Sequence, residues 1–172
     1  IAVPTFLHHE IAINVINSGV HLLVEKPLAG SVQESRDIVD RANNANITLA
    51  VGHIERHNPV VKYAKASLKN GEWGKIINLS SRRVSPYPKR IRDVGVVFDM
   101  AIHDLDVFSY LSNSSLHSVY ASGGSTLSKN EDYVCIVLSF SSGLVGVCEA
   151  SWLTPMKVRK LAITGSSHFV EL

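Results

Sequence analysis

The stretch that decides the fold reads Val20-His21-Leu22-Leu23-Val24-Glu25-Lys26-Pro27. Its apolar run is typical of a buried strand, and Pro27 ends that strand just after Lys26, where a cis bond is allowed. In an open parallel sheet the carboxyl ends of the strands face the ligand crevice. Lys26 therefore stands where a ligand binds, and its ammonium group can donate to a substrate hydroxyl. The alternative is a lysine that pairs with Glu25 at a strand end.

Strands and helices alternate on both sides of this stretch. We expect a strand that ends at residues 1–3, a helix over 7–17 with Thr5 as its N-cap, a strand at 21–24, a helix at 31–44 capped by Ser31, and a strand at 47–52. This alternation predicts parallel βαβ units and part of a doubly wound sheet. Because the chain opens inside the first strand, we also expect that residues are missing upstream.

From residue 53 onward the pattern changes to consecutive strands with few helices. We expect helices at 59–69 and 98–111, strands at 75–83, 118–123, 133–140, 144–153 and 158–164, and a hairpin turn at residues 141–143. Such an order is typical of a mostly antiparallel sheet with helices on one face. The predicted fold class is therefore α/β plus α+β, with a partial parallel domain at residues 1–52 and an open-sheet α+β domain at residues 53–172.

The composition is that of a globular protein with ample core, since 45% of the 172 residues are hydrophobic and 19% are charged. The formal net charge of +2 indicates no nucleic-acid partner. No apolar run approaches the ~20 residues of a transmembrane helix, and no signal peptide is visible, so we expect no membrane association and a cytoplasmic location. Cys135 and Cys148 lie in apolar alternating segments and are expected to be reduced and buried.

A second group of polar residues is Asp99-x-x-x-His103, near the start of the predicted helix at 98–111. On an α-helix this spacing puts the two side chains on one face, about one turn apart. A carboxylate beside a histidine orients the ring and suits general acid–base catalysis, in which a hydroxyl loses its proton as the alcohol is oxidised. The alternatives are a surface ion pair and a metal site, but the spacing suggests no third ligand and we expect no metal.

Polar residues also follow the ends of the other predicted strands. The segment Gly52-His53-Ile54-Glu55-Arg56-His57-Asn58-Pro59 lies where the two domains join, and Arg56 there can hold an anionic or polyhydroxylated group. The alternative is a hinge loop followed by a helix that Asn58 caps. His8 follows the strand end at residues 1–3 and is either a residue of the ligand edge or a capping and packing residue.

Four motifs follow one another along the chain: Val3-Pro4-Thr5-x-x-His8, Glu25-Lys26-Pro27, Gly52-His53-x-x-Arg56-x-Asn58-Pro59 and Asp99-x-x-x-His103-Asp104. In this order they resemble the glucose–fructose oxidoreductase / inositol dehydrogenase / rhizopine catabolism family (Gfo/Idh/MocA), and the resemblance covers essentially the whole chain. It implies an NAD(P)-dependent oxidoreductase. The first domain would be the C-terminal half of a Rossmann-type parallel sheet, and the second would bind substrate and carry an open sheet often used for oligomerisation.

The resemblance also implies roles for individual residues. Lys26 is expected to touch the nicotinamide ribose and the substrate, with Pro27 in the cis form frequent in the family, and His103 is expected to be the base beside Asp99. The positions that line the nicotinamide side of the cofactor are matched by Pro4, Thr5, His8 and Glu25, and a position near cofactor and substrate is matched by Arg56. The implied cofactor is NAD or NADP, and the implied assembly is a homo-oligomer formed through the C-terminal sheet.

One departure from the family pattern is the missing GxGxxG turn, which receives the pyrophosphate at a helix N-terminus. Gly123-Gly124 lies in the wrong domain and does not open a helix. The residue that selects NAD over NADP is absent too. We therefore expect a central piece of a longer enzyme, cut at both ends, with little affinity for NAD by itself. The alternative is an inactive binding or oligomerisation module.

Residues 82–96 directly precede the Asp99 helix and carry the basic run Lys89-Arg90-Ile91-Arg92. Their pattern is similar to the branch of the family that acts on UDP-N-acetylglucosamine, the nucleotide-sugar 3-dehydrogenases. Basic side chains there suit a diphosphate through charge-assisted hydrogen bonds. We therefore expect a UDP-N-acetylhexosamine substrate. The alternatives are an inositol or simple sugar substrate, and a loop that is only a solvated connection.

Overall fold

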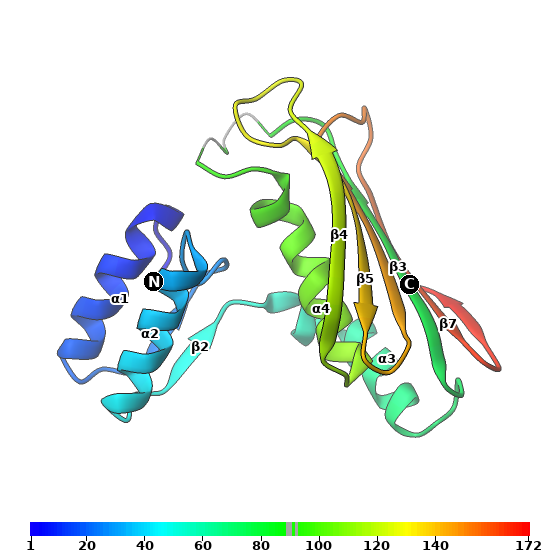
Figure 1. The fold of residues 1–172 in the computed structure, drawn as a ribbon, viewed down its shortest axis with the longest axis horizontal. Helices are drawn as coiled ribbons and strands as arrows, with labels where there is room; N and C mark the ends of the chain where they lie inside the picture. Colours follow the sequence, from blue (N-terminus) through cyan, green and yellow to red (C-terminus); the bar gives the residue numbers. More distant parts are fainter. Residues whose placement is uncertain (89–90, 92) are drawn as a thin grey trace. The chain divides into compact units, whose positions relative to one another are not determined.

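The computed structural model describes residues 1–88, 91 and 93–172, which form two compact units, Ile1–His53 and Ile54–Leu172 (Figure 1). Three residues of the predicted basic run, Lys89, Arg90 and Arg92, lie outside the described residues. The first unit contains a parallel strand pair with its helices, and the second contains a six-stranded, mostly antiparallel sheet. The predicted fold class is therefore confirmed.

The first unit is built on two short strands, β1 (Leu22–Val24) and β2 (Leu49–Val51), which pair in parallel. Two helices, α1 (His8–Asn17) and α2 (Val32–Asn44), pack against each other and bury apolar side chains against β1. The Oγ of Ser31 accepts a hydrogen bond from the backbone N–H of Glu34 at 3.1 Å, so the predicted cap of α2 is confirmed.

Two details of this unit differ from the prediction. Residues 1–3 are not a strand, although the Ile1 amino group donates to the carbonyl of Leu23 (2.6 Å) and the Ile1 carbonyl accepts from Glu25 (2.9 Å). These bonds come from a single residue, and a strand needs a ladder of several. Thr5 is not the N-cap of α1, because it lies in the 3₁₀ helix η1 (Thr5–Leu7), which leads directly into α1 at His8.

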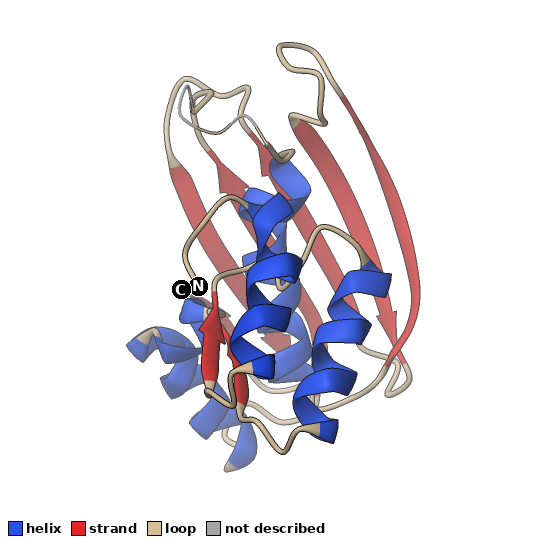
Figure 2. Cartoon of the chain, turned by 90° about the vertical axis from the view of Figure 1, so that its left-hand side faces the viewer, coloured by secondary structure: helices blue, strands red, loops and turns tan. Residues whose placement is uncertain are grey.

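The second unit begins with η2 (Ile54–His57) and α3 (Pro59–Lys69) and continues with β3 (Ile76–Val84), the π-helical turn η3 (Val97–Ala101), α4 (Ile102–Ser112), β4 (Leu116–Gly124), β5 (Tyr133–Phe140), β6 (Val145–Ser151), β7 (Val158–Gly165) and β8 (Phe169–Glu171). The strand order is β4-β5-β6-β3-β7-β8, and among the described strands of this sheet only β3 and β6 pair in parallel. Figure 1 shows α3 and α4 on one face of the sheet, and Figure 2 shows its long strands side by side. No helix within the described ranges is both long enough and apolar enough to cross a bilayer.

Side chains alternate along the strands and give the sheet two different faces. On the helix side, Phe108 of α4 is fully buried, and a Cβ on Gly146 of β6 would lie only 2.8 Å from its ring. Glycine therefore lets the ring pack directly onto the strand. On the opposite face Tyr120, Val137 and Val147 are exposed on three neighbouring strands. This second face is apolar, and no helix in the described part of the unit covers those three side chains.

The sequence predicted the cap of α3 and the hairpin turn of this unit, but not the start of its second helical segment. Asn58 caps α3 by accepting from the N–H of Val60 at 3.1 Å, and Gly143 makes the hairpin turn with φ +85°. The helix predicted at residues 98–111 instead begins as η3, in which the N–H of Ile102 reaches back five residues to the carbonyl of Val97. The short strand β8 was not predicted, since three residues show no clear alternation.

The two cysteines lie on opposite faces of the sheet. Both are free thiols, and Cys148 is buried as predicted. Cys135 is exposed, so the prediction that both are buried was wrong for this residue. The reason is strand alternation: the register partner of Cys148 is Ile136, so Cys135 points to the other face.

Candidate functional site

Lys26 lies two residues beyond β1, at the carboxyl edge of the parallel pair. The peptide bond from Lys26 to Pro27 is cis, Pro27 is buried and Lys26 is half-buried. At the end of β2, Gly52 donates its N–H to the carbonyl of Val24 at 2.7 Å. A Cβ on Gly52 would lie 2.9 Å from Oε2 of Glu25, so glycine leaves room for that carboxylate over the strand end. Glu25 and Lys26 thus occupy the edge at which parallel sheets bind ligands.

His8 is turned toward the backbone of this edge. Its side chain is buried, with Nδ1 2.8 Å from the carbonyl oxygen of Pro27 and Nε2 2.9 Å from that of Val3. The Pro27 carbonyl belongs to the segment after β1, and the Val3 carbonyl belongs to the first residues of the chain. The His8 ring therefore links these two segments. Of the two alternatives for His8, this geometry is that of a packing residue that holds the Lys26–Pro27 segment. Pro4 and Thr5, just before it, are exposed and half-buried.

Asp99 and His103 lie in consecutive parts of one helical segment, and both are half-buried. Asp99 belongs to η3 and His103 to the first turn of α4. The hydrogen bond from Ile102 to Val97 spans five residues, so this turn is wider than the α-turn on which the predicted spacing was based. A π-turn inside a helix is often found at functional sites.

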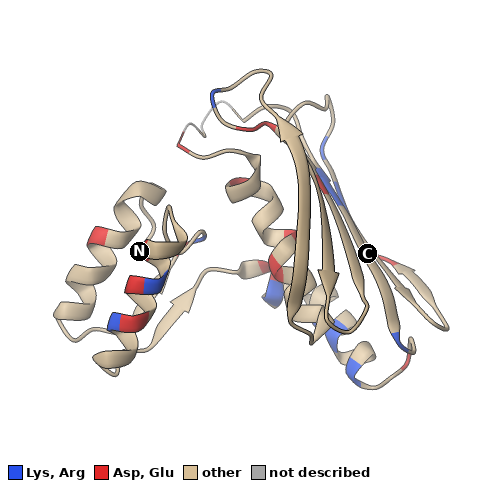
Figure 3. Ribbon diagram, in the orientation of Figure 1, with Lys and Arg blue, Asp and Glu red and all other residues tan. Residues whose placement is uncertain are grey.

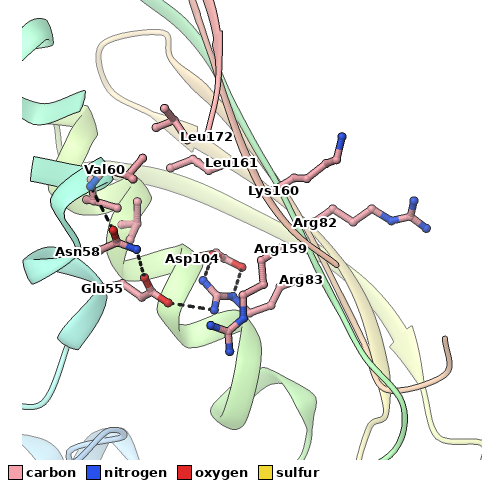
Figure 4. A pocket seen from close by; sticks show the side chains of 12 residues that line it. Glu55, Asn58, Val60, Arg82, Arg83, Asp104, Arg159, Lys160, Leu161 and Leu172 are labelled. Carbon is pink, nitrogen blue, oxygen red and sulfur yellow. Dashed lines mark hydrogen bonds and ion pairs between the residues drawn. The ribbon is translucent and has the colours of Figure 1, made fainter. Parts of the chain in front are cut away.

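Directly after His103, Asp104 belongs to a buried ion-pair network, which consists of Arg83, Asp104 and Glu55 (Figure 4). Arg83 donates from Nε and Nη2 to the two oxygens of Asp104 at 3.0 and 2.8 Å, and from Nη1 to Glu55 at 3.1 Å. Both Arg83 and Asp104 are buried. The bidentate pair ties β3 to the first turn of α4 and so fixes the helix beside His103.

Glu55 remains ionised within this network. Burial acts to raise the pKa of Glu55, but the hydrogen bond from Asn58 and the positive charge of Arg83 outweigh it and hold that pKa below its ordinary value of 4.5. Glu55 therefore contributes a negative charge to the region around the α4 start.

Arg56 forms an ion pair with Asp106 within the second unit. Its guanidinium forms a bidentate ion pair with Asp106, at 2.6 and 2.8 Å, and lies 5.5 Å from the centre of the Tyr110 ring. The sequence prediction gave this side chain to a bound anion or polyol. In the structure its guanidinium pairs with Asp106, and this pair joins η2 to α4.

A pocket of about 180 Å³ lies inside the second unit, between the sheet and the helices. The Arg83 network lines its polar side, and Arg159 stands next to Arg83 on the neighbouring strand β7 (Figure 4). Arg82 and Lys160 project from the other side of the same two strands. None of the residues predicted to be catalytic lines this pocket. Its carboxylates are held by Arg83, so we assign it no catalytic role.

Sequence reasoning named some residues near the site but missed how they are connected. Arg83, Asp104 and Glu55 were each noted within a motif, but no local pattern pairs them, because Arg83 is 21 residues from Asp104 and 28 from Glu55. Glu131 was missed entirely, although its carboxylate accepts from the N–H of Val97 at the start of η3. No spacing signal exists for a contact over 34 residues.

The first unit thus carries a lysine at the carboxyl edge of its parallel strand pair, where open parallel sheets bind ligands. Residues 1–53 match the family model described as oxidoreductase family, NAD-binding Rossmann fold, and residues 61–171 match the GFO/IDH/MocA C-terminal domain. The chain therefore belongs to the GFO/IDH/MocA oxidoreductase family.

Named relatives match most of the chain in sequence. UDP-N-acetylglucosamine 3-dehydrogenase from Acidithiobacillus ferrooxidans is 29% identical over 100% of this chain and 54% of its own length. The NAD(+)-dependent scyllo-inositol 2-dehydrogenase from Bacillus subtilis is 30% identical over 90% of this chain and 48% of its own length. The solved structure of the WlbA dehydrogenase from Bordetella pertussis, in complex with NADH and UDP-GlcNAcA, superimposes with a TM-score of 0.92 at 25% identity, covering 99% of this chain and 54% of that one. The chain thus spans about half the length of these relatives.

Proposed function

We propose that the natural protein carrying these residues is an NAD(P)-dependent dehydrogenase that oxidises a hydroxyl of a UDP-N-acetylhexosamine to a ketone. The observation that carries the proposal is the position of Lys26, at the carboxyl edge of the parallel pair in the unit that matches the NAD-binding family model. Named dehydrogenases among the relatives support the reaction class. We further propose that residues 1–52 contribute to the dinucleotide domain and residues 53–172 to the substrate and oligomerisation domain.

The proposed reaction needs one group that removes a proton and others that hold the hydroxyl. When NAD(P) is bound, it supplies the acceptor for the hydride that leaves the carbinol carbon. His103 takes the hydroxyl proton as general base, and Asp99 in the preceding turn stabilises the imidazolium that forms. Lys26 donates a hydrogen bond to the reacting oxygen and stabilises negative charge on it. The Arg83–Asp104 pair keeps the helix beside His103 in place.

The residues at the β1 edge suit the nicotinamide end of the cofactor. The ammonium of Lys26 can donate to a ribose hydroxyl, and the carboxylate of Glu25 can accept a hydrogen bond from one. Glu25 is exposed and Lys26 is half-buried, so neither side chain is closed off in the core. We propose that Pro4, Thr5 and Pro27 complete this side. We propose that His8 holds the Lys26–Pro27 segment in place through the carbonyl of Pro27. We propose that Arg56 holds η2 against α4 through its ion pair with Asp106. The 172 residues contain no GxGxxG turn, so we propose no pyrophosphate site among them.

A substrate panel tests the proposal. Purified natural protein would be incubated with NAD or NADP and with UDP-N-acetylglucosamine, scyllo-inositol or a simple hexose, and NADH or NADPH formation would be followed by absorbance. We expect turnover of the UDP-sugar at the highest kcat/KM. Turnover of inositol alone would contradict the UDP-sugar assignment and favour an inositol dehydrogenase. If no alcohol were turned over, the dehydrogenase proposal itself would be contradicted.

We propose a second function for the exposed face of the sheet, which is self-association. Tyr120, Val137 and Val147 form an apolar patch there, and Tyr120 is 72% exposed. Contiguous apolar patches on a protein surface commonly mark interaction sites. Sedimentation analysis of the chain and of Val137→Lys would test it. A wild-type oligomer that dissociates in the variant supports the proposal, whereas a wild-type monomer contradicts it.

A further inference from the structure

The helical segment that carries Asp99 and His103 begins at an N-cap residue, Val96, whose side chain cannot supply a capping oxygen. Helices leave their first backbone N–H groups without partners, and Ser, Thr, Asp or Asn at the N-cap normally supplies an oxygen for them. Here the N-cap residue of η3 is Val96, and no side-chain cap from that residue is formed. The residue before it is Gly95, which has no side chain.

Glu131 supplies the missing partners from the loop between β4 and β5. Its backbone carbonyl accepts from the N–H of Val96 at 2.8 Å, and its carboxylate Oε1 accepts from the N–H of Val97 at 3.2 Å. Two N–H groups at the start of η3 are thus held by one residue that lies 34 positions further along the chain. A carboxylate at a helix N-terminus is also favoured by the helix dipole.

Gly95 makes this contact possible. A Cβ built on Gly95 would lie 2.2 Å from the carboxyl carbon of Glu131, closer than any real contact. The backbone at Gly95 is not in the left-handed region that would itself demand glycine. The requirement at this position is therefore space for the Glu131 carboxylate.

The loop that presents Glu131 is itself pinned by the next residue. Asp132 is fully buried, and its Oδ2 accepts from the N–H groups of Thr126 and Leu127 at 2.8 and 2.5 Å. Its backbone N–H donates to the carbonyl of Gly124, and its own carbonyl accepts from Trp152 of the β6 end. The position of Glu131 is thus fixed by the sheet rather than by the helix that it caps.

From these contacts we infer that Glu131 is a positioning residue, which caps η3 from the sheet and so sets the place of Asp99 and His103. The inference rests on the proposed function, since it assigns Glu131 to the groups that we propose for proton removal. The capping contact itself can be measured without any turnover.

Amide hydrogen exchange followed by NMR tests the capping contact in the 172-residue chain. In Glu131→Ala the amides of Val97 and Asp99 should exchange about 5- to 30-fold faster, the effect of losing a helix cap. The amide of Val60, which Asn58 caps in α3, should not change and serves as the internal control. Glu131→Gln keeps an oxygen acceptor and should restore most of the protection.

Gly95→Ala gives an independent test, because its methyl group would displace the carboxylate while residue 131 remains a glutamate. If it acts only in this way, the double variant Gly95→Ala/Glu131→Ala exchanges no faster than Glu131→Ala. The imidazole chemical shifts of His103 should move in Glu131→Ala and Gly95→Ala and return in Glu131→Gln. A general loss of stability would not be rescued in this way.

Three results would overturn the inference: unchanged exchange at Val97 in Glu131→Ala, additive effects in the double variant, or His103 shifts that do not respond. In the natural protein, Glu131→Ala should lower kcat more than it raises KM. If the natural protein turns over no alcohol, the proposed function fails, while faster exchange and shifted His103 signals would still establish the cap. The two failures are therefore distinguishable.

Discussion

Removing the positive charge of Arg83 should strongly destabilise the second unit. Arg83 makes three charge-assisted hydrogen bonds, to both oxygens of Asp104 and to Glu55, and its side chain is 10% exposed. In Arg83→Met the apolar stem is retained and only the guanidinium is lost. Asp104, with a side chain 7% exposed, is then left as a buried charge without its guanidinium. Breaking a buried pair in this way costs roughly 3–5 kcal/mol.

The neighbouring residue on the same strand provides a matched control. Arg82 pairs with Glu149 at 3.0 Å, but the two side chains are 54% and 39% exposed. An exposed pair of this kind contributes at most about 1 kcal/mol. Urea unfolding near neutral pH would therefore show a much larger loss for Arg83→Met than for Arg82→Met. Equal losses would refute the reasoning that burial makes the difference.

The same network predicts a pH dependence with a definite sign. The pKa of Glu55 is held below its ordinary value of 4.5 in the folded state, so its contribution to stability is complete above pH 4.5. That contribution is lost as the pH falls below 4.5 through the lower pKa of the folded state. In Arg83→Met the Glu55 carboxylate loses one of the charges that lower its pKa, so the acid loss of stability should be smaller than in the wild type.

Three further predictions concern single features of the chain. A thiol reagent at mildly alkaline pH should modify Cys135 quickly and Cys148 only on unfolding, because burial raises the pKa of Cys148 to about 12; two fast thiols would contradict this. Gly146→Ala should lower the free energy of unfolding by about 1–3 kcal/mol, since the new methyl meets the Phe108 ring, and an unchanged urea midpoint would disprove that contact. Calorimetry should detect little or no NAD binding by the 172-residue chain, because it has no GxGxxG turn, and tight binding would show that another segment holds the pyrophosphate.

Local signals in the sequence were enough for most of the fold. The apolar run before Lys26, the Ser31 and Asn58 caps and the turn at Gly143 each depend on a few neighbouring residues, and each has its counterpart in the structure. The π-turn before His103 could not be predicted, because nothing in residues 97–101 distinguishes a five-residue backbone bond from the ordinary four-residue one. Its start depends on Glu131, a contact that exists only after the sheet has formed.

The candidate site was predictable as a set of residues and not as a set of contacts. Lys26 was placed at a strand end by its sequence context alone, and the structure has it at the carboxyl edge of the parallel pair. For His8 the sequence left a ligand role and a packing role open, and its ring lies within hydrogen-bond distance of two carbonyls. Arg56 was expected near a ligand, and its ion pair with Asp106 was not foreseen. Such contacts join residues up to 50 positions apart, so periodicity and motif spacing carry no information about them.

The most direct test of the central claim is the turnover of Lys26→Ala and His103→Ala in the natural protein, measured as NADH formation with UDP-N-acetylglucosamine. Circular dichroism and urea unfolding would first establish that both variants fold as the wild type does. If Lys26 holds the reacting oxygen and His103 removes the proton, each variant should lose about 10²–10⁴-fold in kcat. Turnover at the wild-type rate in either variant would contradict the role that we give to that residue.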